Sequence, residues 1–190
     1  MEPPISEFDA DQPSPVQAMD WLALSDEALL AGCRFEAFRG SGPGGQKRNK
    51  TSNSIRLTHL PTGLHVSAEE SRSQLENKTR ALRRIKLKLA TELRRAIDPR
   101  AIFEPPAWFA EVMMLGRLRA SHHNAYYARA AALLLDLLES RRGNIGDAAK
   151  LLGVTTSSAV RFLETEPQLW AAANHLRKQF GLPGLEKRKG

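Results

Sequence analysis

The 190-residue chain is 42% hydrophobic with a formal net charge of +7, which fits one domain of ordinary size or two small ones. Its longest apolar run, residues 130–135, is too short to cross a bilayer, and the first residues carry no secretory or transit pattern. We therefore expect a cytoplasmic protein with no membrane partner. The single cysteine, Cys33, cannot form an internal disulfide, and we interpret it as a small buried thiol.

The positive charge is concentrated in the middle of the chain. Residues 34–100 contain 16 Lys and Arg against 6 Asp and Glu, whereas residues 1–33 contain only acids among their charged residues. Such a basic block suits a phosphate backbone, because neutralising phosphates releases counterions. A solvated helix surface would give the same composition, so charge alone does not decide between the two.

The first elements can be predicted in chain order. Residues 1–15 combine prolines with acids and are expected to form a disordered leader. Ser25, followed by two acids, is a good helix N-cap for a short helix through residues 28–30. Residues 34–39 then alternate as a strand does, with Phe35 and Glu36 on opposite faces, and a glycine-rich stretch ends that strand.

A hairpin and a long helix are predicted next. Residues 54–60 alternate with Ile55, Leu57 and His59 on one face, and a Pro-Thr-Gly turn leads into a returning strand at 64–69. His59 and His65, beside the turn, are expected at the surface. After the hairpin, the sequence predicts a helix of roughly 22 residues that ends before residue 98. Its apolar stripe consists of Leu75, Leu82, Leu89 and Ala96, with Ile85 and Leu93.

From residue 105 to residue 182 the pattern is helical throughout. Within it, residues 147–163 have the spacing of a helix-turn-helix around Gly153. A DNA-reading helix should carry several base-reading side chains, yet Arg161 is the one long polar side chain between residues 155 and 163. Ordinary helix packing and docking on a ribosome or tRNA remain open beside DNA binding.

These patterns predict an α+β fold in which a short sheet with a hairpin and a long basic helix precede an all-helical C-terminal segment. We expect a leader at 1–15, an α+β domain at 16–100 and a helical domain at 101–190 with a short basic tail.

The glycine-rich stretch, Gly40-Ser-Gly-Pro-Gly-Gly45, satisfies the letters of a dinucleotide-binding loop, but its surroundings do not fit one. Such a loop needs a buried apolar strand before it and a helix after it, whereas residues 34–39 are half polar and a strand follows. A phosphate-binding P-loop would end in Gly-Lys-Ser/Thr, but Gln46 follows Gly45. Both readings are rejected.

The residue types favour a different chemistry. Gly44 and Gly45 lack Cβ atoms, so the backbone there can closely approach a nucleotide. Gln46 does not ionise near neutral pH, yet its amide donates and accepts hydrogen bonds at once, which suits orienting a water molecule. Lys47, Arg48 and Lys50 would hold the loop against phosphates.

Residues 34–90 resemble the catalytic domain of the class I peptide chain release factors, whose hallmark is a Gly-Gly-Gln tip. The match covers RGSGPGGQKRNKTSNSIRLTHLPTG from Arg39, then Arg72-Ser73-Gln74 and Asn77-Lys78 at the family's spacing. The resemblance implies hydrolysis of the ester between a nascent peptide and P-site tRNA in the large ribosomal subunit. The glutamine would coordinate the attacking water, and its backbone N–H would stabilise the oxyanion. No cofactor or metal is implied, because ribosomal RNA forms most of the catalytic environment.

The resemblance also assigns residues by position. Gly44, Gly45 and Gln46 would form the catalytic tip. A second set would shape the loop or bind RNA and the ribosome: Arg39, Lys47, Arg48, Asn49, Lys50, Thr51, Arg56, Arg72, Ser73, Gln74 and Lys78. Arg48 stands where the family often has a small apolar residue, and Ser71 stands where it has an acid.

Members of the family that read stop codons carry large domains before the tip. Because 33 residues precede Arg34 here, we expect this chain to resemble the short, codon-independent rescue factors. The expected partners are large-subunit ribosomal RNA and P-site peptidyl-tRNA, with a glutamine methyltransferase as a further partner and a monomeric state off the ribosome. Two other hypotheses remain. The chain could be a non-catalytic ribosome- or RNA-binding protein, or a helix-turn-helix regulator with an unrelated basic domain.

Overall fold

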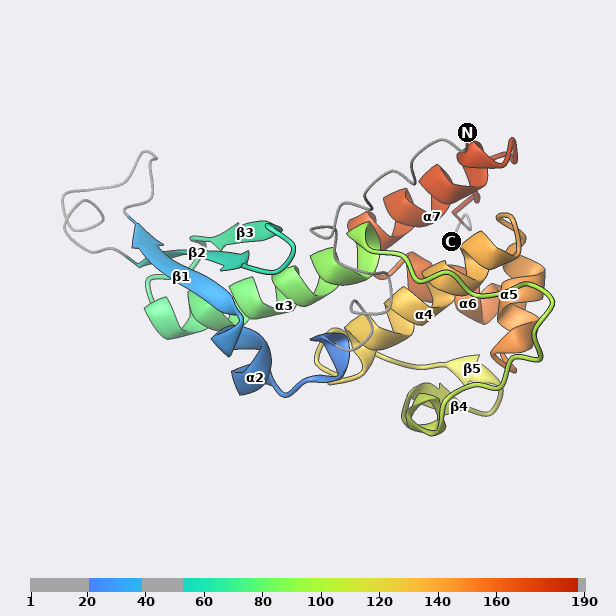
Figure 1. The fold of residues 1–190 in the computed structure, drawn as a ribbon, viewed down its shortest axis with the longest axis horizontal. Coiled ribbons are helices and arrows are strands. Elements are labelled where there is room, and N and C mark those ends of the chain that lie inside the picture. The colour runs from blue at the N-terminus through green and yellow to red at the C-terminus, as the bar shows by residue number, and fades with distance from the viewer. Residues whose placement is uncertain (1–20, 39–52, 188–190) are drawn as a thin grey trace, which may run out of the picture.

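The structure is a computed structural model that describes residues 21–38 and 53–187. At one end of the molecule a three-stranded antiparallel sheet lies against the long helix α3, and at the other end several helices form a cluster (Figure 1). The α+β class predicted from the sequence is therefore confirmed.

The sheet forms where the alternating segments predict it. Its strands, in the order β1-β2-β3, are β1 (Cys33–Phe38), β2 (Ser54–His59) and β3 (His65–Ala68). The preceding helix α2 (Asp26–Ala31) begins at Ser25, whose Oγ accepts a hydrogen bond from the Ala28 N–H at 3.2 Å. Gly63 closes the hairpin turn with φ of 68°, a conformation that glycine adopts without a steric penalty.

Cys33 is partly buried at the start of β1 rather than fully enclosed. Its Sγ lies 3.2 Å from the Leu29 carbonyl oxygen, and burial raises the pKa of the thiol. A raised pKa keeps the thiol protonated, which agrees with its interpretation as a small packing residue.

His59 is buried, and its prediction as a surface residue was wrong. Only 1% of it is exposed. Its Nδ1 lies 2.9 Å from the Thr62 hydroxyl, and its ring meets the edge of Trp21 at 4.6 Å between centroids. The alternation of β2 places His59 on the face of Ile55 and Leu57, which packs inward. Burial also lowers its pKa.

Helix α3 (Gln74–Glu92) buries a different stripe from the one predicted. Leu82 and Leu89 are buried as expected, but Leu75 is 75% exposed and Ala96 lies beyond the helix. A strict seven-residue repeat drifts by about 20° per heptad on a straight α-helix, so residues seven apart do not all face the core.

Helix α3 also ends earlier than predicted, because tertiary partners replace its next helical bonds. The Arg95 N–H and the Arg94 guanidinium both donate to Oδ1 of Asp136, each at 3.1 Å. Asp136 belongs to helix α4 (Tyr127–Ser140) and is 2% exposed. Burial raises its pKa to about 6, against the opposing effects of the Arg94 charge and the Arg95 N–H.

From α4 onward the chain is helical, as predicted. Residues 107–118, which were predicted as helical, instead form a 3-10 helix and a hairpin with two residues in each strand. The elements outside α4 are η1 (Ala107–Val112), β4 (Met113–Met114), β5 (Arg117–Leu118), α5 (Ile145–Leu151), α6 (Thr156–Leu163) and α7 (Pro167–Gln179).

The predicted helix-turn-helix spacing is confirmed in α5 and α6. Asn144 caps α5 and Thr155 caps α6, and Gly153 turns the chain between them with φ of 68°. On the buried side of α6, the Ser158 hydroxyl accepts a hydrogen bond from the Leu118 N–H at 2.7 Å. This bond attaches the short hairpin to α6.

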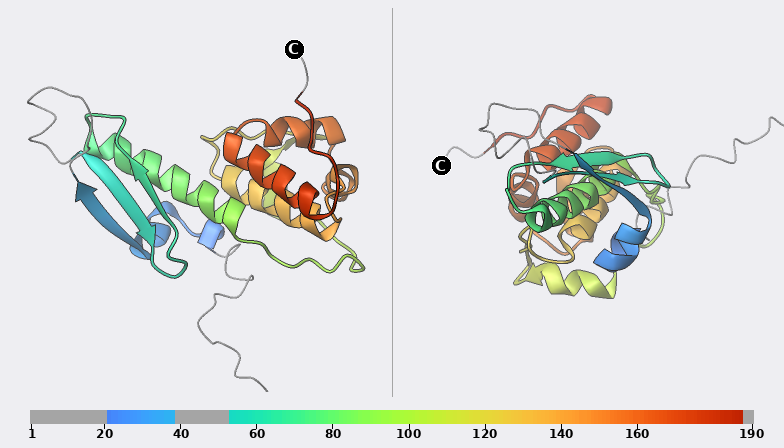
Figure 2. Two further views of the ribbon diagram at one scale, coloured as in Figure 1. Left: turned by 90° about the horizontal axis from the view of Figure 1, so that it is seen from above. Right: turned by 90° about the vertical axis from the view of Figure 1, so that its left-hand side faces the viewer.

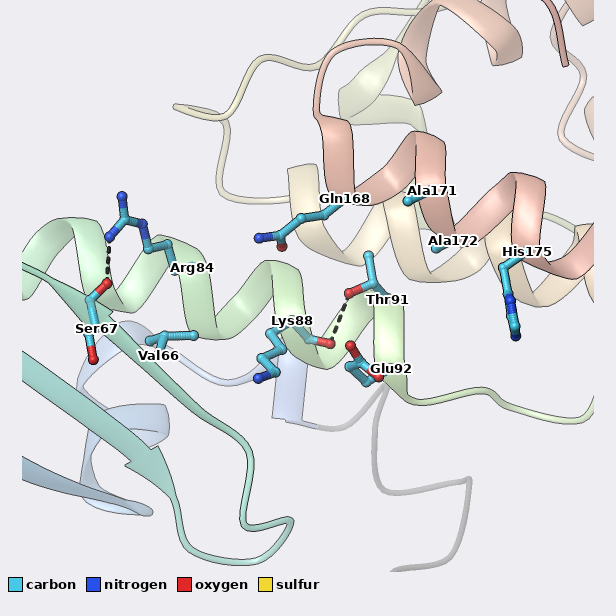
Figure 3. Close-up of a pocket in the computed structure, with 10 residues that line it drawn as sticks. All are labelled: Val66, Ser67, Arg84, Lys88, Thr91, Glu92, Gln168, Ala171, Ala172 and His175. Carbon is cyan, nitrogen blue, oxygen red and sulfur yellow. Dashed lines mark hydrogen bonds between the residues drawn. The ribbon is translucent and has the colours of Figure 1, made fainter. Parts of the chain in front are cut away.

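Helix α3 belongs to both ends of the molecule. It packs on β2 and β3 and also contacts α4 and α7, as Figure 2 shows from above. A groove lies between β3, α3 and α7, with side chains from all three elements along it (Figure 3). Among the residues that the structure describes, no helix is long and apolar enough to span a bilayer.

Candidate functional site

The predicted catalytic tip lies outside the described residues. Residues 39–52 include nine of the predicted site residues, whose roles stay predictions: Arg39, Gly44, Gly45, Gln46, Lys47, Arg48, Asn49, Lys50 and Thr51. The structure does describe where this segment leaves the sheet and where it returns. Phe38, the last residue of β1, pairs with Ser54, the first residue of β2. The chain therefore leaves β1 and rejoins β2 at neighbouring positions on the same end of the sheet, with residues 39–53 between them.

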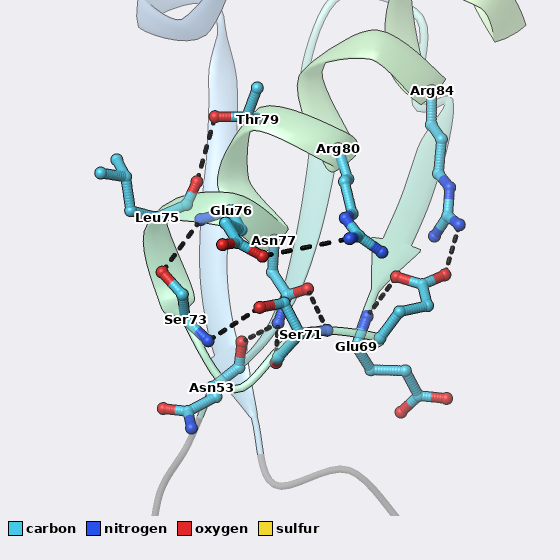
Figure 4. A network of polar contacts seen from close by, with 11 residues as sticks. Asn53, Glu69, Ser71, Ser73, Leu75, Glu76, Asn77, Thr79, Arg80 and Arg84 are labelled. Atoms are coloured by element: carbon cyan, nitrogen blue, oxygen red, sulfur yellow. Dashed lines mark hydrogen bonds and ion pairs between the residues drawn. The ribbon is translucent and has the colours of Figure 1, made fainter.

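Asn77 in α3 holds the residue at which the chain returns to the sheet (Figure 4). Its side chain is fully buried, and its Nδ2 donates to the carbonyl oxygens of Asn53 at 2.7 Å and Ser71 at 2.8 Å. Its Oδ1 accepts from the Ser71 N–H at 3.0 Å. One buried amide thus ties together the entry to β2, the connection after β3 and the first turn of α3.

The first turn of α3 carries three of the predicted RNA-contacting residues. Ser73 is the N-cap: its Oγ accepts from the Glu76 N–H at 3.3 Å, and its own N–H donates to the Ser71 hydroxyl at 3.0 Å. Arg72 and Gln74, on either side of Ser73, are exposed. Ser73 therefore has a structural role here, while its two neighbours face solvent.

The other two described candidates, Arg56 and Lys78, lie over aromatic rings of β1. The Arg56 guanidinium is 5.5 Å from the centroid of Phe38, and the Lys78 ammonium is 5.8 Å from that of Phe35. Because residues three apart in a strand point to opposite faces, the two cations lie on opposite sides of the sheet. The structure does not bring them into one patch, but both stay exposed near the ends of the 39–52 segment.

A charged pair supports the connection between β3 and α3. The Arg84 guanidinium donates to the Glu70 carboxylate and to the Ser67 carbonyl oxygen, the latter bond being drawn in Figure 3. Burial tends to raise the pKa of Glu70, but its hydrogen bond and charge interaction with Arg84 outweigh this and lower the pKa. Glu70 is therefore ionised at neutral pH. Among the described residues no group of three or more His, Cys, Asp or Glu side chains could hold a metal ion.

The structural role of Asn77 was missed in the sequence, although a signal for it exists. Four of the five fully buried residues of α3 follow a spacing of four, namely Asn77, Ala81, Ile85 and Leu89, and the fifth is Ala90. Residues four apart share one helix face. A lone amide in line with three apolar residues indicates a buried polar group that needs partners.

Comparison with known proteins assigns this part of the chain. Residues 30–102 match a family model described as the RF-1 domain. The chain contains an RF-1 domain. The matched residues run from the end of α2 to ten residues beyond α3, so the domain includes the sheet, the 39–52 segment and the Asn77 contacts. The helices α4 to α7 lie outside it.

Two relatives are about half identical to this chain within the aligned segment alone. Peptide chain release factor 1 of Lachnoclostridium phytofermentans is 46% identical over 76 residues, 40% of this chain and 21% of that protein. Peptide chain release factor 2 of Saccharopolyspora erythraea is 52% identical over 56 residues, 30% of this chain and 15% of that protein. The chain thus spans about a fifth or less of the length of these relatives.

Proposed function

We propose that this protein hydrolyses the ester of peptidyl-tRNA on the ribosome. The observation that supports the proposal is the RF-1 match over residues 30–102, which includes Gly44, Gly45 and Gln46. Proteins that share this segment at 46% and 52% identity are named peptide chain release factors.

The chemistry required of Gln46 is the orientation of a water molecule. Its amide stays neutral, so it cannot act as a general base, but it can hold the water against the ester carbonyl. The water oxygen bonds to the carbonyl carbon, and the bond to the tRNA ribose oxygen breaks. The peptide leaves as a carboxylic acid, and the tRNA regains its hydroxyl. The Gln46 backbone N–H donates to the oxyanion that develops, and ribosomal RNA supplies the remaining groups.

The described residues would position this tip. Asn77 fixes Asn53 and with it the direction in which the segment re-enters β2. Arg56 lies close in sequence to the C-terminal end of that segment, and Arg72 and Lys78 lie close to the start of α3. All three side chains are exposed and can contact phosphates. These contacts orient the protein without reading base identity.

We further propose that hydrolysis does not require a stop codon. The matches to the release factors are confined to 56–76 residues of this chain, within 15–21% of the relatives' length. The helices α4 to α7 lie outside the RF-1 match, and this proposal gives them no part in codon reading.

A peptide-release assay tests both proposals. Ribosomes carrying labelled peptidyl-tRNA in the P site are mixed with the protein, with or without a stop codon in the A site. We expect release in both cases, loss of release in Gln46→Ala with ribosome binding retained, and normal release in Gln179→Ala, a control at an exposed glutamine of α7. Release that depends on the stop codon would refute codon independence. Absence of release by the wild type would favour a non-catalytic RNA-binding protein.

A further inference from the structure

Two hollows along α3 join into one groove between the RF-1 domain and the helices that follow it. The first, of about 670 Å³, lies between β3, α3 and α7 (Figure 3). The second, of about 650 Å³, lies between α3, residues 122–128 and the start of α7. Arg84 and Gln168 line both hollows, so the two meet at these side chains. We call the combined feature the α3 groove.

The α3 groove carries a net positive charge. Five cations of α3 line it, namely Arg80, Arg83, Arg84, Lys86 and Lys88, against three carboxylates, Asp26, Glu92 and Glu166. Part of this charge is already paired, since Lys86 contacts Asp26 and Arg84 contacts Glu70 outside the groove.

Arg83 and Lys88 are the cations best placed to meet a ligand. The hydrogen bond of Arg83 is to Nδ1 of His123 at 3.2 Å, and that of Lys88 is to the His65 carbonyl oxygen at 3.1 Å. Neither partner is a carboxylate, so neither bond cancels the positive charge of Arg83 or Lys88. An anion in the groove gains that charge without first displacing a carboxylate from these two side chains.

We propose that the α3 groove holds the phosphate backbone of a single RNA strand. The two hollows form a continuous path along α3, which suits an extended single strand. Among the described lining residues Tyr127 is the one Phe, Trp or Tyr, and it is buried; the other rings are the imidazoles of His122, His123 and His175. The groove therefore offers mainly cations to phosphates, with the imidazoles as the rings that a base could meet. The choice of RNA rests on the proposed action at the ribosome.

The proposal gives the C-terminal helices a role. Gln168 and the three groove histidines, His122, His123 and His175, all lie outside the RF-1 match, and they form the wall opposite α3. Figure 3 shows Gln168 extending from α7 toward α3. The RF-1 domain alone would present its basic helix as an open face, whereas the whole chain encloses a strand from two sides.

Binding of a labelled oligouridine of about 12 nucleotides tests the proposal. All variants carry Gln46→Ala, so hydrolysis plays no part in the measurement. Each phosphate contact on a single strand contributes about 0.7 to the slope of log affinity against log salt. We therefore expect the double variant Arg83→Ala/Lys88→Ala to lower the slope by about 1.4 and to weaken binding about 25-fold near 0.1 M salt.

The matched control removes the same charge elsewhere. Lys150→Ala/Arg161→Ala changes two exposed cations of α5 and α6 that do not line the groove, and binding should weaken less than twofold. Equal losses in the two double variants would overturn the proposal. Competition by duplex RNA as strong as that by the single strand would overturn it as well.

A second pair of variants tests the wall formed by α7. Gln168→Glu places a carboxylate in the groove and should weaken binding several-fold, whereas Ser157→Glu, at an exposed position of α6 outside the groove, should not. Equal effects of the two substitutions would contradict the assignment of α7 as a wall of the groove.

The binding result is independent of the release assay. A protein that binds RNA through the groove without releasing peptide would refute only the proposed function. Normal release with binding indifferent to all groove variants would refute only this inference.

Discussion

Replacing Asn77 should destabilise the protein more than any exposed substitution in α3. Asn77→Ala removes two hydrogen bonds to carbonyl oxygens and one from an N–H, and it leaves a small void at a fully buried position. Each lost bond costs about 1 kcal/mol, and more where the partner left behind stays shielded from water. The sum is about 2 to 4 kcal/mol, a large share of the about 5 to 15 kcal/mol typical of a folded domain.

Urea denaturation followed by circular dichroism measures this cost. Thr79→Ala serves as the control, because Thr79 is exposed and its hydroxyl bonds only to the Leu75 carbonyl oxygen within the helix. We expect the control to change the free energy of unfolding by less than about 0.5 kcal/mol. If Asn77→Ala costs no more than Thr79→Ala, the amide does not hold the segment as the structure indicates.

A conservative variant separates hydrogen bonding from volume. Asn77→Asp keeps the shape and the acceptor for the Ser71 N–H but turns an oxygen toward the carbonyl oxygens of Asn53 and Ser71. At neutral pH the buried carboxylate should be at least as destabilising as alanine. Its cost should shrink as the pH falls, because a protonated carboxyl can donate one hydrogen bond. A cost independent of pH would contradict the assignment, because ionisation of the introduced carboxyl would then not be what destabilises the variant.

Three further predictions concern two buried side chains and one turn glycine. The wild type should lose up to about 3 kcal/mol of stability relative to Asp136→Asn as the pH rises from about 4 to about 6. The reason is that the folded-state pKa of Asp136 lies above its ordinary value of 3.8. An unchanged difference in denaturation midpoints across this pH range would contradict the prediction. Ser158→Ala should cost about 1 to 3 kcal/mol in urea denaturation, since it leaves the Leu118 N–H without its buried acceptor, whereas exposed Ser157→Ala should cost less than about 0.5. Gly63→Ala should lower thermal stability by about 1 to 2 kcal/mol through its positive φ alone, because nothing lies within 4 Å of an added Cβ; a stabilised variant would refute this.

Much of the sheet could be predicted because its determinants are local. The alternation of residues 34–39 and 54–60 and the Pro-Thr-Gly turn specify strands and a hairpin without reference to the rest of the chain. The α+β class and the helix-turn-helix spacing follow from the same kind of pattern. The Gly-Gly-Gln segment identified the family, although its own placement lies outside the described residues.

What the sequence did not predict depends on distant partners. The end of α3 is set by Asp136, more than 40 positions beyond it, and no local pattern reveals that bond. His59 looked like a turn residue, yet its strand places it against Trp21. Asn77 was noted only for its spacing, although its position on the buried stripe could have identified it as a buried hydrogen-bonding residue.

The length of α3 explains how these distant features can act together. Nineteen helical residues span about 28 Å, so one rigid element carries Asn77 near the 39–52 segment and reaches α4 at its other end. The cations of the α3 groove lie between these two points, on the same backbone. A strand bound in the groove would therefore be fixed relative to the base of the glycine-rich segment by helix geometry alone.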